Sequence, residues 1–180
     1  MGSNFTLACQ FLINTLFGLY TGAVLLRFLL QAVRADYYNP LAQIVVKLTN
    51  PLLLPLRRII PGWRKLDLAA LVLAYLLALL NLALVMLLYG VMPALLPWLL
   101  GGLLRLALIL LNLYTFTILI QALMSWLAPG YHPVMAALAS VNEPLLRPVR
   151  RLIPPLGGLD LSPLFVLLGL QVLRILLAGH

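Results

Sequence analysis

Charge is what this sequence lacks most. Charged residues make up 9% of its 180 positions, whereas a soluble domain carries about 25%. Residues 1–26, 68–104 and 106–142 contain no Asp, Glu, Lys or Arg. Apolar runs longer than about 18 residues are typical of transmembrane helices. The scarcity of charge therefore excludes an ordinary soluble domain and predicts an all-α integral membrane protein.

Acidic residues are especially scarce, and the sequence has four of them: Asp36, Asp67, Glu143 and Asp160. All four lie outside the long uncharged runs. Transporters that couple to protons or cations commonly place carboxylates at membrane depth. The missing carboxylates argue against such a transporter, although the carbonyl groups of broken helices could bind a cation without them.

Cysteine and histidine are also nearly missing, since the sequence contains only Cys9, His132 and His180. A lone cysteine excludes an intrachain disulfide. These three residues do not supply the ligand set of a zinc-type site, and no nucleophile is paired with a base. We therefore expect no metal, no cofactor and no enzymatic activity.

Basic residues are in excess, giving a net charge of +8. Nine of the twelve Lys and Arg residues fall in residues 34–67 and 128–160, and the exceptions are Arg27, Arg105 and Arg174. Nucleic-acid-binding proteins gather basic residues on a soluble face, so we expect no nucleic-acid partner. Basic loops stay on the cytoplasmic side of a membrane. The sequence predicts a multi-pass protein with both basic loops in the cytoplasm, or the stroma of an organelle, and both termini outside.

One stretch of the sequence occurs twice at a constant offset. Residues 50–68 read NPLLLPLRRIIPGWRKLDL, and residues 143–161 read EPLLRPVRRLIPPLGGLDL. Between residues 38–71 and 131–164, 14 of 34 positions are identical, including paired prolines, arginines and aspartates. Such pairing at one offset indicates an internal duplication. We expect tandem parallel repeats, 1–93 and 94–180, related by a pseudo-two-fold axis along the membrane normal.

Four transmembrane helices are expected, two in each repeat. They cover roughly residues 5–33, 68–92, 98–127 and 161–178, the last being barely long enough to span. In the first, Gly18 and Gly22 would let another helix approach closely. Arg27, near the end of that helix, could snorkel to the interface or face the protein interior.

Several polar side chains lie within these expected spans. We expect them to form interhelical hydrogen bonds, and a polar pathway is the alternative. They are Asn14, Asn81, Asn112, Gln121 and Gln171.

Each basic loop, residues 34–67 in the first repeat and 128–160 in the second, is expected to hold short amphipathic helices. These helices would lie in the membrane interface or dip into the membrane as re-entrant elements. In the first loop, Asn-Pro pairs place a capping side chain before a proline suited to a first helical turn, so one helix is expected from Pro40 and another from Pro51. The predicted capping residues of the chain are Asn39, Asn50, Asp67, Asn142 and Asp160.

The arginine pairs Arg57–Arg58 and Arg150–Arg151 are the sharpest chemical feature. They could hold the loops on the cytoplasmic side, or bind anionic lipid headgroups or an acidic partner, together with Lys47 and Arg147. A third possibility is internal pairing with Asp67 and Asp160, each ten residues after the first arginine of a pair.

The motif N-P-x-L-x-P-x-R-R-x-I-P followed by L-D-L occurs twice in the sequence. In this respect the sequence resembles the YggT family, also called YlmG. The likeness covers almost the whole chain, and the second copy departs from it with Glu143 in place of Asn50. The resemblance implies a small protein of the bacterial inner (plasma) membrane that is associated with osmotic stress tolerance, cell or plastid division, or the assembly of membrane complexes. It implies no catalytic residues.

Two functions from different classes follow from these observations. The leading interpretation is a non-enzymatic membrane-organising or assembly protein, a homo-oligomer or a member of a membrane complex, whose loops bind anionic lipid or partner proteins. The alternative is a small oligomeric channel or transporter for an ion or osmolyte.

Overall fold

The computed structural model describes residues 2–36, 38–60, 62, 66–92, 94–127, 132–153 and 160–179. These residues form α1 (Gly2–Ala32), α2 (Pro40–Ile59), α3 (Leu68–Leu88), α4 (Leu95–Leu127), α5 (Pro133–Leu152) and α6 (Ser162–Ala178). No strand occurs within these ranges, so the all-α prediction is confirmed. Parts of the repeated motif, namely Pro61 and residues 63–65 and 154–159, lie outside the described residues.

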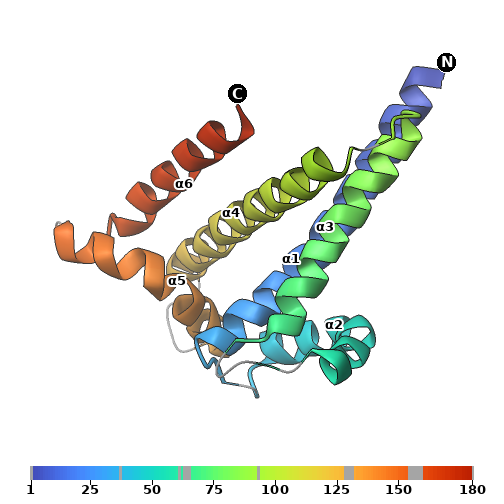
Figure 1. Ribbon diagram of the computed structural model, residues 1–180. Coiled ribbons are helices and arrows are strands. Elements are labelled where there is room, and N and C mark those ends of the chain that lie inside the picture. Colours follow the sequence, from blue (N-terminus) through green and yellow to red (C-terminus); the bar gives the residue numbers. More distant parts are fainter. Residues whose placement is uncertain are drawn as a thin grey trace.

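The two halves of the chain have the same order of elements: a long helix, a crossing helix, and a returning helix (Figure 1). α1 packs along α3 with α2 across their ends, and α4 packs against α5 and α6. The N-terminus, the α3–α4 connection and the C-terminus point toward the upper part of Figure 1, opposite to α2. The repeat boundaries and the pseudo-two-fold axis stay predictions.

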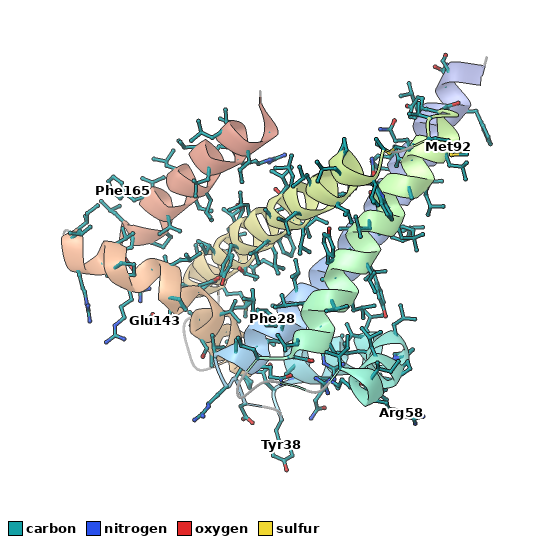
Figure 2. All side chains as sticks on the ribbon, in the orientation of Figure 1. Phe28, Tyr38, Arg58, Met92, Glu143 and Phe165 are labelled. Carbon is teal, nitrogen blue, oxygen red and sulfur yellow. The ribbon has the colours of Figure 1, made fainter. Side chains whose placement is uncertain are left out.

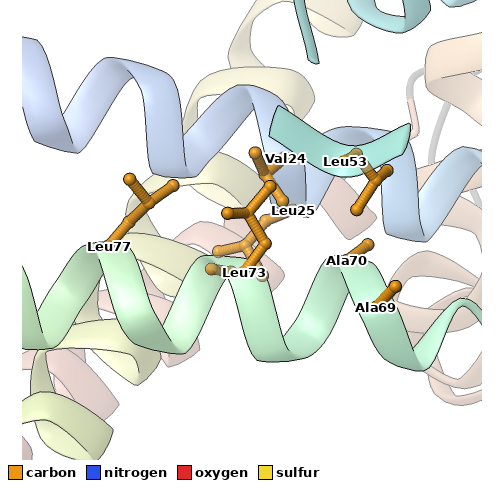
Figure 3. Packing of buried hydrophobic residues seen from close by; sticks show 8 residues of the cluster. Val24, Leu25, Leu53, Ala69, Ala70, Leu73 and Leu77 are labelled. Atoms are coloured by element: carbon orange, nitrogen blue, oxygen red, sulfur yellow. The ribbon is translucent and has the colours of Figure 1, made fainter. Parts of the chain in front are cut away.

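The tightest core lies where α1, α2 and α3 meet (Figure 3). Val24 and Leu25 of α1 pack against Leu73 of α3, and Leu53 of α2 closes the cluster at its end. Alanines at the start of α3 are fully buried there, and their small side chains allow the helix backbones to approach closely.

The backbones of α3 and α4 also approach each other closely. This contact lies at Gly102, which the sequence analysis of small residues did not single out. A Cβ atom added at Gly102 would collide with the Leu79 side chain and lie 3.3 Å from Tyr75 Cε2. Added Cβ atoms at Gly18 and Gly22, in contrast, meet nothing within 4 Å. Within the described residues no helix therefore approaches these two glycines closely, and both line an open groove.

Three helices within the described residues are long and apolar enough to cross a membrane: Ser3–Ala32, Leu68–Leu88 and Leu95–Ser125. Their outward surfaces expose large apolar side chains such as Phe11, Leu76 and Phe116, which is unusual for a soluble protein. α6 is a shorter apolar helix of 17 residues, about 26 Å long against a hydrocarbon core of about 30 Å. The fourth span stays a prediction.

The expected break between two short helices in the first basic loop is absent. α2 runs without interruption for 20 residues and contains Pro51 and Pro55, and α5 contains Pro144 and Pro148 in the same way. A proline inside a helix removes one backbone hydrogen bond and usually bends the helix rather than ending it when the freed groups find other partners. The freed carbonyl groups belong to the residues four positions before each proline, and all of these residues lie at exposed positions: Lys47, Pro51, Ser140 and Pro144. The freed carbonyl groups are therefore not buried in the core.

Candidate functional site

Arg27 joins α1 to the middle of α2. Only 6% of this residue is exposed, and its Nη1 donates to Thr49 Oγ1 (2.7 Å), Asn50 Oδ1 (2.8 Å) and the carbonyl oxygen of Val46 (3.3 Å). Of the two interpretations of Arg27, the structure supports the one that faces the protein interior. The same contacts explain why Asn50 does not cap a helix: its side chain serves as an acceptor for Arg27 inside α2, so that prediction is wrong.

The second half of the chain has a neutral contact at the corresponding place. Thr117 Oγ1 of α4 donates to Asn142 Oδ1 (2.8 Å), and Asn142 Nδ2 donates to Gln121 Oε1 (2.8 Å). Asn142 is fully buried inside α5, so the prediction that it caps a helix is also wrong. Its amide instead ties α5 to α4, because a buried amide needs partners for both its donor and its acceptor.

Asp67 lies at the start of α3 and has two partners. Its Oδ1 accepts from the backbone N–H of Ala70 (3.3 Å) as the N-cap of the helix. Its Oδ2 forms an ion pair with Arg57 Nη2. The Asp67 side chain is 3% exposed, and a carboxylate buried to this extent is stable as a charge only when it is paired and hydrogen-bonded.

Asp160 has similar partners in a more exposed setting. It accepts from Ser162 N (2.9 Å) and from Arg150 Nε (2.8 Å), and Arg150 Nη1 also bridges to Glu143 Oε2 (3.0 Å). Partial burial pushes the pKa of Asp160 up, but the hydrogen bonds from Ser162 and the Arg150 guanidinium outweigh it and leave the pKa below its ordinary value. Leu161, not Asp160, occupies the N-cap position of α6. Asp160 lies one residue before that position and accepts its hydrogen bond from Ser162, the first residue of the helix.

The remaining predicted residues lie at the surface or connect the loops. Asn39 is the N-cap of α2, accepting from Leu41 N (2.9 Å), and its Nδ2 donates to the carbonyl oxygen of Pro133 at the start of α5. It thus links the two basic loops. The other basic residues of the predicted set are exposed on α2 and α5: Lys47, Arg58, Arg147 and Arg151. Figure 2 shows Arg58 at the end of α2 and Glu143 on α5.

A cavity of about 280 Å³ lies between the end of α1 and α2. Its lining includes Arg27, Gln31, Arg34 and Arg57, and none of the described residues that line it is acidic. Arg57 Nη2 also donates to Gln31 Oε1 (3.1 Å). The sequence pattern grouped Arg57 with Arg58, but the structure groups it with two arginines of α1 and its C-terminal turn. Nothing in the spacing of these arginines revealed that grouping, because it depends on how α2 folds back across α1.

Polar side chains also form hydrogen bonds between the apolar helices. Arg105 Nη2 of α4 donates to Asn14 Oδ1 of α1 (2.9 Å), and Asn81 Nδ2 of α3 donates to the carbonyl oxygen of Ile13 (3.3 Å). The predicted interhelical hydrogen bonds are therefore confirmed for Asn14, Asn81 and Gln121.

Comparisons with known proteins give a consistent result. The family described as CCB3/YggT matches residues 6–88 and 100–180. An uncharacterized protein of Pseudomonas aeruginosa is 46% identical over 176 residues, which cover 96% of this chain and 89% of the relative. The uncharacterized protein YggT of Escherichia coli K12 is 39% identical over 164 residues, covering 91% and 86%. YlmG homolog protein 2, chloroplastic, of Arabidopsis thaliana is 35% identical over 61 residues, covering 34% of this chain and 24% of that protein. No solved structure matches the chain.

Proposed function

Because this chain belongs to the CCB3/YggT family, we propose that it is a non-enzymatic protein that organises or assembles membrane components. Its basic loops bind anionic lipid headgroups at the membrane surface and present the same surface to partner proteins. The role is linked to osmotic stress tolerance or cell division, and the protein acts as a homo-oligomer or within a membrane complex.

The observation that carries this proposal is the division of α2 into three faces. Ala42, Val45 and Thr49 are buried against the protein. A second face exposes apolar side chains at a spacing of four residues, Ile44, Leu48 and Leu52. The third face carries exposed polar and basic side chains: Gln43, Lys47 and Arg58. A helix with one apolar and one basic exposed face is suited to lie in the interface between lipid tails and headgroups.

The proposed orientation follows from the position of the basic side chains. The protein lies in the bacterial inner membrane with four spans, α2 and α5 at the cytoplasmic surface, and both termini outside. The cytoplasmic leaflet carries anionic lipids that attract basic segments close to the membrane. Arg58 and Arg151, which are exposed at equivalent positions of the two helices, would then contact headgroups from both halves.

The test measures the retention of phosphatidylglycerol and phosphatidylcholine on purified protein by native mass spectrometry. Arg58→Gln with Arg151→Gln should lower phosphatidylglycerol retention several-fold and leave phosphatidylcholine retention unchanged. Arg174→Gln, which removes an exposed arginine outside both loops, is the matched control. Equal phosphatidylglycerol retention by the wild type and the double variant would refute headgroup binding by these loops.

The second candidate function is a small channel or transporter for an ion or osmolyte. It is favoured by the contact of Arg105 with Asn14, since charged side chains within spanning segments commonly mark ion or substrate pathways. Solute flux into proteoliposomes, compared between the wild type and Arg105→Leu, tests this candidate. Flux that requires Arg105 would support transport, and vesicles as tight as protein-free controls would exclude it.

A further inference from the structure

We propose that the chain binds one anionic glycerophospholipid between α1, α2 and α4, with the lipid phosphate in the basic cavity and one acyl chain in an adjoining apolar groove. This inference rests on the proposed function, but it names a single site, a ligand class and a stoichiometry of one lipid per chain.

The phosphate end of the site is built from three guanidinium groups. Arg27, Arg34 and Arg57 line the same cavity of about 280 Å³. Arg27 is held in place by its hydrogen bonds to Thr49 and Asn50, and Arg57 by its contacts with Gln31 and Asp67. Guanidinium groups bind phosphate oxygens through paired N–H donors. Two of the three arginines are therefore positioned before a ligand arrives.

Arg34 occupies a backbone position that normally favours glycine. Its φ is +55°, and the hydrogen bonds Arg34 N to Gln31 O (3.1 Å) and Ala35 N to Leu30 O (2.9 Å) close the C-terminus of α1. This is the arrangement in which the left-handed residue is usually glycine or asparagine. An arginine here strains the backbone, and strained residues cluster at ligand sites. The placement is explained if the Arg34 side chain has a ligand to bind.

The acyl-chain end is an apolar groove of about 480 Å³ between α1 and α4, bordered by α2 and α5. Gly18, Gly22 and Leu26 form its α1 side, and Leu113 and Phe116 form part of its α4 side. The two glycines leave it open, because an added Cβ at either position would meet no atom within 4 Å.

Two geometric relations place the groove beside the cavity. Val45 of α2 lines both of them. Gly18 precedes Arg27 by nine residues on α1, which corresponds to about 14 Å along the helix. One leaflet contributes about half of a hydrocarbon core of about 30 Å. A lipid whose phosphate lies at Arg27 could therefore extend one chain past Gly18 within its own leaflet.

Charge complementarity selects this occupant. A free phosphate would fill only the cavity, and a second copy of this chain would bring an apolar helix to the groove but no anion to the cavity. Of the three arginines that line the cavity, Arg57 is paired with Asp67, so the described residues leave the cavity with a net positive charge. A phospholipid with a net negative charge satisfies both ends of the site at once.

The experiment measures the number of phosphatidylglycerol molecules that remain on the full-length protein at increasing collision energy in native mass spectrometry. The wild type should keep one molecule per chain after all others have dissociated. Arg34→Gly should reduce this tightly bound fraction at least tenfold, while its melting temperature without lipid equals or exceeds that of the wild type, because glycine relieves the left-handed strain. Gly22→Leu, which fills the groove, should cause a similar loss. Gly169→Leu on α6, where an added Cβ also meets nothing within 4 Å, is the matched control and should keep its lipid.

Each alternative has its own outcome. Retention of the tight lipid by both Arg34→Gly and Gly22→Leu would overturn the proposal. Displacement of the lipid by soluble glycerol phosphate, with no effect of Gly22→Leu, would show a simple anion site and overturn the acyl-chain assignment. Loss of a dimer in Gly22→Leu without loss of lipid would show a second copy in the groove and also overturn it. If Arg58→Gln with Arg151→Gln lowers total phosphatidylglycerol retention while Arg34→Gly keeps the tight lipid, the proposed function stands and this inference fails.

Discussion

At the scale of single residues, Asp67 combines two roles that the sequence offered as alternatives. Its two carboxylate oxygens are divided between the backbone of α3 and the guanidinium of Arg57. The carboxylate therefore satisfies a helix N-terminus and neutralises one arginine of the basic cavity at the same time. Asp160 has the same two kinds of partner, but it is more exposed than Asp67. Equivalent residues of the two loops should therefore differ in their energetic importance.

Replacement of Asp67 should separate capping from charge pairing. Asp67→Asn keeps an oxygen that can accept from Ala70 N but loses the charge that pairs with Arg57. Asp67→Ala loses both, and we expect it to be less stable than Asp67→Asn by about 0.5–2 kcal/mol, the usual contribution of a capping side chain. Thermal unfolding in detergent measures the difference. If Asp67→Asn and Asp67→Ala unfold at the same temperature, the ion pair alone accounts for the effect of Asp67.

Asp160 should make a pH-dependent contribution to stability. Because its pKa is lower in the folded protein than its ordinary value, its contribution is fully present above the unfolded-state pKa of about 3.9. The contribution is lost as the pH falls through the lower pKa of the folded state. We expect Asp160→Asn to unfold at a lower temperature than the wild type at pH 7 and the difference to shrink below about pH 4.

The size of this effect should be modest, since exposed ion pairs contribute about 0–1 kcal/mol and are screened by salt. Melting temperatures of both proteins from pH 7 to pH 3, at low and high salt, test it. A difference that stays constant across this pH range would mean that Asp160 acts without its charge.

At the scale of helices, α3 and α4 are held together by a glycine contact, whereas α1 and α4 are separated by a groove at Gly18 and Gly22. Gly102 lies against Leu79 and Tyr75, and Trp98 Nε1 donates to the Leu79 carbonyl oxygen (3.0 Å) nearby. Tyr75 Oη also donates to the Leu99 carbonyl oxygen (3.0 Å). The start of α4 is therefore fixed on α3 by close packing and by two side-chain hydrogen bonds.

We expect Gly102→Val to destabilise the protein by about 1–3 kcal/mol, because it inserts methyl groups into a packed contact. Gly169→Val is the control, since it has the same change in helix propensity but its added Cβ meets no atom within 4 Å. Thermal unfolding in detergent compares the two variants. An equal loss of stability in both variants would show that the change in helix propensity, and not the α3–α4 contact, accounts for the effect.

At the scale of the whole molecule, the helices place the basic loop that contains α2 and the α3–α4 connection at opposite ends of the protein (Figure 1). Tyr38 and Arg58 lie at one end and Met92 of the α3–α4 connection lies at the other (Figure 2). If α1 and α3 both span the membrane, these two ends face opposite compartments.

We expect single cysteines to report this topology once Cys9, the one cysteine of the sequence, is replaced by serine. Gly62→Cys should react with a membrane-impermeant thiol reagent from the cytoplasmic side. Ser3→Cys and Met92→Cys, both at exposed positions, should react from the outside. Labelling of Gly62→Cys and Met92→Cys from the same side would exclude the proposed topology.

The sequence by itself determined the features that depend on composition and local chemistry. Long uncharged runs predict apolar helices wherever the surroundings are lipid, because backbone groups in lipid must be hydrogen-bonded within the helix. An asparagine before a proline predicts the start of α2, and Asn39 is the N-cap there, because capping involves only neighbouring residues.

Only the tertiary structure decided the features that depend on residues far apart in the sequence. The same Asn-Pro pattern does not start a helix at Asn50, because Arg27 from α1 donates to the Asn50 side chain and α2 continues through Pro51. The grouping of Arg27, Arg34 and Arg57 around one cavity depends on α2 crossing the end of α1. Local patterns cannot reveal such a grouping, because hydrogen bonds and packing between distant segments determine which side chains meet and override local preference.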